Sequence, residues 1–140
     1  MENMLLSGEF DHALDPKGRI TLPASCRDYF RDRAVLVRLP DNEPCVRVYH
    51  PDAWNEFDTK YLEPLNVFES ESDSWRQRII YRNQNIVDID RQGRVLIPSQ
   101  RIKELGLSGK VKILGNRTHL EIWDPATLAA LEKERGDGHV

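Results

Sequence analysis

Cysteine is scarce in this chain, and long hydrophobic runs are lacking. Only Cys26 and Cys45 occur among 140 residues, too few for a disulfide framework and without the C-x-x-C spacing of a zinc or redox site. We expect both to be small, partly buried thiols. No segment reaches the roughly 18 consecutive apolar residues of a membrane helix, and the first residues do not resemble a signal peptide. These absences predict a cytoplasmic protein that makes no contact with a membrane.

A large net charge of either sign is also lacking, since the formal value is only −3. The charges are nevertheless segregated along the chain. Residues 41–75 carry nine acids and two Lys or Arg, whereas residues 76–117 carry ten Lys or Arg and three acids. Residues 15–38 add a basic excess of three. Because binding to a polyanion depends on the local potential, this pattern leaves room for a basic face, although ordinary solvated surface would also explain it.

Recognisable catalytic motifs are missing as well. Asp88 and Asp90 form the candidate acid pair, but no histidine or nucleophile accompanies them in a motif. The four histidines lack the i, i+4 spacing of a helical zinc site, and no glycine-rich phosphate loop is present. We therefore expect no enzymatic activity, no catalytic residue, no metal and no cofactor.

An internal repeat is the strongest positive signal. Residues 15–23 (DPKGRITLP) recur 75 positions later as residues 90–98 (DRQGRVLIP). The agreement continues downstream, where residues 46–51 (VRVYHP) correspond to residues 120–125 (LEIWDP). Agreement in register over so many positions indicates a duplicated unit.

Each copy predicts a strand, a tight turn, a second strand, a short helix, a β-hairpin and a closing helix that begins at a proline. In the turns, Asp15 and Asp90 can accept hydrogen bonds from backbone N–H groups two or three residues further on. Gly18 and Gly93 supply the left-handed conformation that such a turn requires. We assign these four residues to turn formation.

The segment between the copies predicts a helical insert. Its apolar residues, among them Trp54, Phe57 and Ile80, follow nearly helical spacing, and Ser72 is a candidate N-cap for the second helix. We divide the chain into a first unit, an insert, a second unit and a C-terminal helix with a tail, at residues 7–54, 55–81, 82–127 and 128–140. The predicted class is α+β and rich in strand.

The two D-x-x-x-R turns, Asp15 to Arg19 and Asp90 to Arg94, each followed by a strand and a proline around a helical spacer, resemble the MraZ family. The resemblance extends from about Gly8 to Leu131. It implies two tandem AbrB-like swapped-hairpin half-units that form a pseudo-dimeric barrel, with flanking helices.

The resemblance also implies a function. Proteins of this family assemble as ring-like homo-oligomers and bind direct repeats in double-stranded promoter DNA, upstream of the division and cell-wall gene cluster. They act mainly as repressors, which implies association with the nucleoid. Lys17, Arg19, Arg91 and Arg94 fall where the family presents basic side chains to DNA. Gln92 replaces the lysine in the second copy, so we expect the first turn to contribute more.

Alternatives remain open at this point. Arg19 and Arg94 could simply pair with the aspartates of their own turns. Arg27, Arg31, Arg33, Arg101 and Lys103 are further basic residues, most of them expected to be solvated and a minority to meet phosphates. An AbrB-like antitoxin, or a scaffold that docks a basic face onto an acidic partner, are the rival functions. The short tail and the presence of both copies in one chain argue against the antitoxin.

Overall fold

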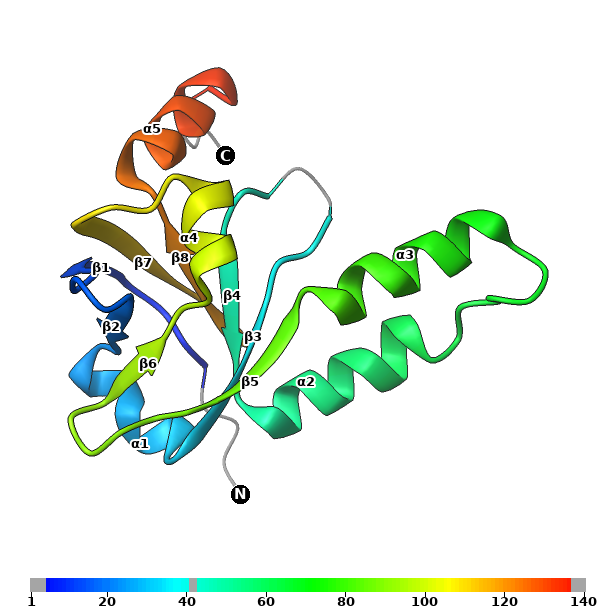
Figure 1. Cartoon of the computed structure of the whole chain (residues 1–140), viewed down its shortest axis with the longest axis horizontal. Coiled ribbons are helices and arrows are strands. Elements are labelled where there is room, and N and C mark those ends of the chain that lie inside the picture. Colours follow the sequence, from blue (N-terminus) through cyan, green and yellow to red (C-terminus); the bar gives the residue numbers. More distant parts are fainter. Residues whose placement is uncertain (1–4, 41–42, 137–140) are drawn as a thin grey trace.

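The computed structural model describes residues 5–40 and 43–136 (Figure 1). This part of the chain has the predicted strand-rich α+β class. In chain order the elements are β1 (Glu9–Ala13), β2 (Arg19–Thr21), the 3-10 turn η1 (Ala24–Cys26), α1 (Arg27–Phe30), β3 (Arg33–Val37), β4 (Val46–Tyr49), α2 (Pro51–Phe57), the π-helical turn η2 (Asp58–Leu62), α3 (Glu71–Arg82), β5 (Gln84–Asp88), β6 (Arg94–Leu96), α4 (Ser99–Leu105), β7 (Lys110–Asn116), β8 (His119–Trp123) and α5 (Pro125–Glu134).

The two repeat copies exchange their first strands. Six strands form one antiparallel sheet in the order β1-β7-β8-β4-β3-β5. Strand β1 of the first copy pairs with β7 in the hairpin of the second copy, and β5 of the second copy pairs with β3 in the hairpin of the first. Strands β4 and β8 join the two hairpins at the centre. Each copy therefore needs the other to complete its sheet.

The described strands do not close into one continuous barrel, and the pseudo-dimeric barrel stays a prediction. The six-stranded sheet has β1 at one edge and β5 at the other, while β2 and β6 pair with each other in a separate antiparallel ribbon. A single bridge between Leu14 and Ile20 connects this ribbon to the residue that follows β1. The physical reason lies in the tight turns after β1 and β5. They direct each following strand across a face of the sheet, where its apolar side is buried, rather than along the sheet edge.

The main core lies between this ribbon and the sheet. Ile20 and Val95, which face each other in the ribbon, are 0% and 1% exposed. Both copies contribute buried side chains to this core, including Leu22, Phe30, Leu36, Val46, Val48, Ile97, Leu105, Val111, Ile113, Leu120 and Ile122. Because units of about 50 residues bury little surface alone, the shared core explains why the copies are interleaved.

The insert packs against the opposite face of the sheet. Trp54, Leu62 and Ile80 form a second buried cluster with Val35 and Tyr49. Figure 1 shows α2 and α3 extending together as an arm away from the strands. We call this arm, residues 51–82, the helical arm. Helix α2 continues across the boundary assigned between residues 54 and 55, so one helix joins the first unit to the insert.

The N-cap prediction for α3 is wrong by two residues. Ser70 caps the helix, with its hydroxyl accepting a hydrogen bond from the N–H of Asp73 at 3.1 Å. Ser72 already lies in the first turn, because α3 begins at Glu71. The closing helices α2 and α5 do begin at prolines, as predicted. Among the described residues, no helix is long and apolar enough to cross a membrane.

Candidate nucleic-acid interface

The two D-x-x-x-R turns have the same backbone construction. Gly18 and Gly93 adopt φ angles of 84° and 78°, as the sequence predicted. Asp15 Oδ1 accepts hydrogen bonds from the N–H groups of Lys17 and Arg19, at 2.9 and 2.8 Å. Asp90 does the same two and four residues ahead, at 2.9 Å in both cases. The second donor is therefore four residues on rather than three, where the following strand begins.

Each aspartate also pairs with the arginine of its own turn. Arg19 Nε donates to Asp15 Oδ2 at 2.8 Å, and Arg94 Nε donates to Asp90 Oδ2 at 2.7 Å. These hydrogen bonds, led by the one from the arginine backbone N–H, hold the pKa of Asp15 and Asp90 below the usual range. The pairing of Asp with Arg that the sequence left open as an alternative is therefore present in both turns.

The staple does not use up the guanidinium groups. Both bonds are made through Nε, and within residues 5–40 and 43–136 neither arginine forms a hydrogen bond through Nη1 or Nη2. The side chains of Arg19 and Arg94 are 30% and 29% exposed. The carboxylate thus fixes each arginine while leaving its two Nη groups without a partner among the described residues, and this fork can grip a phosphate or a guanine edge.

The ribbon brings these two arginines together. Arg19 lies opposite Leu96, and Arg94 lies opposite Thr21. Because side chains alternate between the faces of a strand, all four lie on the face opposite to the buried Ile20 and Val95 pair. Arg19 and Arg94 are diagonal neighbours, a relation that places Cβ atoms about 7–8 Å apart or less.

Lys17 and Arg91 are not brought together. Each turn precedes one strand of an antiparallel ribbon, so the two turns lie at opposite ends of it. Both side chains are exposed. The predicted DNA-contacting set therefore consists of two central arginines on the ribbon and one flanking cation at each end.

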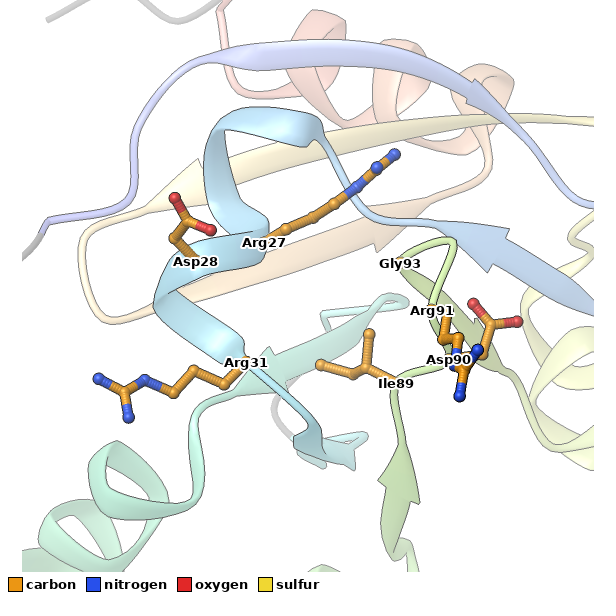
Figure 2. A pocket seen from close by; sticks show the side chains of 7 residues that line it. All are labelled: Arg27, Asp28, Arg31, Ile89, Asp90, Arg91 and Gly93. Atoms are coloured by element: carbon orange, nitrogen blue, oxygen red, sulfur yellow. The ribbon is translucent and has the colours of Figure 1, made fainter.

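Arg27 lies against the second turn, a position that its place in the sequence does not indicate. Its Nε donates to the carbonyl oxygen of Leu22 at 3.3 Å, and its side chain lies directly against Gly93. Figure 2 shows it running past the second turn, beside an open pocket of about 580 Å³ that Arg31 and Arg91 also border. No local motif in the sequence indicates this approach, because it joins helix α1 to a turn more than 60 residues away.

Arg101 is unsuited to binding DNA. It is 6% exposed, and its Nη1 donates to Asn83 Oδ1 at 2.6 Å. Its Nη2 donates to Glu104 at 3.2 Å. This arginine connects the end of the helical arm to α4 and lies outside the solvent-facing set.

Glu43, Cys45 and Glu121 are the only described residues whose ligand atoms gather as a metal site would require, within 4.8 Å of one another. Their chemistry is otherwise engaged. Glu43 pairs with Arg47 at 2.7 Å, and burial raises the pKa of the Cys45 thiol. Burial disfavours the charge of Glu121, but hydrogen bonds from His119, Asn116 and Trp123 outweigh it and lower the pKa to about 2. We assign this cluster to the packing of β4 against β8. Both cysteines are buried and free.

Comparison with known proteins identifies the family. The family model described as "MraZ protein, putative antitoxin-like" matches residues 5–74 and 80–137. A curated relative from Thermomicrobium roseum, named transcriptional regulator MraZ, is 34% identical over 123 residues, which cover 88% of this chain and 84% of that protein. A relative of the same name from Bordetella pertussis is 36% identical over 134 residues, covering 93% and 89%. The chain therefore belongs to the MraZ family, in which these relatives are named transcriptional regulators.

Proposed function

We propose that this chain is a transcriptional regulator that binds double-stranded promoter DNA through the outward face of the β2–β6 ribbon. The observation that carries the proposal is the placement of Arg19 and Arg94 side by side on that face, each held by an aspartate through Nε alone. Membership of a family whose relatives are named transcriptional regulators supports the same function.

The ribbon has dimensions and chemistry suited to a DNA groove. A major groove about 12 Å wide admits a two-stranded β-ribbon. An arginine fork can donate two parallel hydrogen bonds to O6 and N7 of guanine, and the aspartate of each turn orients its arginine before DNA arrives. Lys17 and Arg91, at the two ends of the ribbon, are placed to meet the phosphate backbone, which fixes register without reading sequence.

The regulator acts as a homo-oligomer on repeated sites. One subunit offers few contacts, and a protein that neutralises few phosphates binds weakly at physiological salt. Linked subunits on repeated sites multiply the affinity by roughly a hundredfold or more. Exposed aromatic residues on the helical arm, Phe68 and Trp75, supply apolar surface for subunit contacts. In this proposal the subunits form a ring-like assembly on direct repeats and repress the division and cell-wall gene cluster. The protein is cytoplasmic and associates with the nucleoid.

Fluorescence anisotropy on the purified protein tests this function. The probes are a duplex from its own upstream region and a scrambled duplex of equal length, each titrated across a salt series. We expect preference for the upstream duplex, a steep fall with salt, and loss of preference in Arg19→Ala and Arg94→Ala. Arg19→Lys is the matched variant that keeps the charge and loses the fork.

Assembly must be followed beside binding. Light scattering should give wild type and the arginine variants the same molar mass, because both side chains lie on the solvent face of the ribbon. Equal, weak binding to both duplexes, unchanged in the variants, would favour a basic-faced scaffold. Co-purification of a small toxic protein that the chain neutralises would favour an AbrB-like antitoxin.

A further inference from the structure

Helix α1 and the second turn enclose a pocket of which the proposed function uses only Arg91. Arg27, Arg31 and Arg91 line it, together with Asp28, Asp90, Ile89 and Gly93, around an open volume of about 580 Å³. Figure 2 shows the three guanidinium groups at separate margins, with Ile89 between Arg31 and Arg91. We propose that this pocket binds the phosphate backbone of DNA beside the ribbon, spanning neighbouring phosphates of one strand rather than one isolated anion.

The charges of the pocket favour an anion. Asp90 is already paired with Arg94 and with two backbone N–H groups, so Asp28 is the acid that opposes the arginines. In the part of the chain that the structure describes, neither Arg31 nor Arg91 forms an ion pair or a side-chain hydrogen bond. Exposed cations around a hollow, without carboxylate partners, suit a phosphodiester with its two non-bridging oxygens.

The backbone at Arg31 is a second, independent observation. Arg31 ends α1 with φ 64° and ψ −104°, a conformation that favours glycine. The corresponding position of the second copy, 75 residues on, is Gly106, which ends α4 with φ 65°. The first copy therefore carries an arginine where glycine would fit without strain. A charge needed at this margin of the pocket explains why.

The other end of the ribbon is built differently. Around the first turn, Ile102 packs on Gly18 where Arg27 packs on Gly93. Gly106 and Pro16 stand in place of Arg31 and Arg91. Lys17 is the cation of the first turn, and α4, the helix that packs over this turn, carries Lys103. Since the two ends of the ribbon meet the backbone with different residues, each subunit has a polarity on DNA.

The inference rests on the proposed function, and the test separates the two. Wild type, Arg27→Gln and Arg31→Gln are titrated against the upstream and scrambled duplexes across salt. Each phosphate contact contributes about 0.9 to the slope of log K against log salt. We expect each variant to reduce the slope by about that amount. The affinity for both duplexes should fall by the same factor, roughly three- to tenfold. Lys133→Gln, on α5, removes one exposed charge outside the pocket and should leave the slope unchanged.

A wild-type protein without preference for its upstream duplex would overturn the proposed function itself. Preferential wild-type binding with an unchanged slope in Arg27→Gln and Arg31→Gln would overturn only the pocket. Calorimetry with inorganic phosphate, in the absence of DNA, is a third measurement. Tight phosphate binding that Arg31→Gln abolishes, with no change in the slope for DNA, would reassign the pocket to small phosphorylated solutes and overturn the proposal.

Two further readouts sharpen the result. Arg31→Gly should raise Tm, because it relieves the strained φ, while it weakens DNA binding as Arg31→Gln does. A fall in both Tm and DNA affinity would mean that the arginine serves packing, against the proposal.

In hydroxyl-radical footprints, the Arg27 and Arg31 variants should lose protection on one flank of each site, and Lys17→Gln on the opposite flank. Loss on the same flank would contradict the polarity.

Discussion

The first and second D-x-x-x-R turns have nearly identical backbones and different surroundings. Both close through an aspartate, a glycine of positive φ and an arginine held at 2.8 or 2.7 Å. At Gly18 the nearest atom to an added Cβ would be the Ile102 Cδ1, at 3.2 Å, whereas at Gly93 it would collide with the side chain of Arg27. An apolar contact thus supports one turn and a cation borders the other.

This difference separates the backbone of each turn from the side chains that surround it. The turn itself depends on residues within five positions of one another, so a duplicated sequence produces a duplicated turn. The neighbours come from helices α1 and α4, each of which packs over the turn of the other copy. Divergence in those helices changes the charge around a turn without changing its backbone. The comparison can be tested at both levels.

Removal of both ribbon arginines should have the largest effect. A good bidentate contact to a base contributes about 1–3 kcal/mol of discrimination, and 1.4 kcal/mol is tenfold. We expect about a tenfold loss of specific affinity for Arg19→Ala or Arg94→Ala, and roughly a hundredfold or more for the double variant. Anisotropy on the upstream duplex measures the loss. Single variants that differ by more than tenfold would show that one turn alone reads the sequence.

Alanine at the turn glycines should be the next largest change. A positive φ costs a residue with a side chain about 1–2 kcal/mol, so both Gly18→Ala and Gly93→Ala should lower the free energy of unfolding. Gly93→Ala should lose more, because its Cβ displaces Arg27 and the hydrogen bond to Leu22. Urea denaturation gives the two values. Equal losses would mean that Arg27 moves aside freely.

Exchange of the flanking cation should have a smaller effect. Lys17→Gln makes the first turn resemble the second, and Gln92→Lys does the reverse. Each should change affinity about threefold, in opposite directions, with the salt slope falling or rising by about 0.9. The salt series measures both. A Gln92→Lys variant without a steeper slope would place the tip of the second turn away from phosphates.

Low pH should reduce the stability that the two turn aspartates contribute, and this is the smallest of the expected effects. The pKa of Asp15 and of Asp90 is lowered in the folded protein, so each carboxylate contributes stability above its unfolded pKa of about 3.9. This contribution is lost as pH falls from there through the folded pKa. Asp15→Asn and Asp90→Asn should lower Tm at pH 7 by at most about 3 °C and flatten its decline below pH 4. Thermal melts measure this, and a steeper decline would contradict the assignment.

Much of the site was predictable because its chemistry is local. The residue types and spacing of Asp15 and Gly18 predict the turn. Outside the site, the N-cap of α3 is Ser70, two positions from the predicted Ser72. The sequence also left open whether Arg19 is a staple or a DNA contact. The structure shows that Arg19 does pair with Asp15, and that the pairing uses Nε only.

The sequence by itself determined the duplicated turns, the hairpins and the proline-led helices, because hydrogen bonds and φ preferences within a few residues specify them. Only the tertiary structure decided that β2 pairs with β6, which places Arg19 and Arg94 on one face. It also decided that the sheet remains open and that Arg27 lies on Gly93. These outcomes follow from which apolar surfaces of two interleaved copies can be buried together, and no segment of the chain encodes that alone.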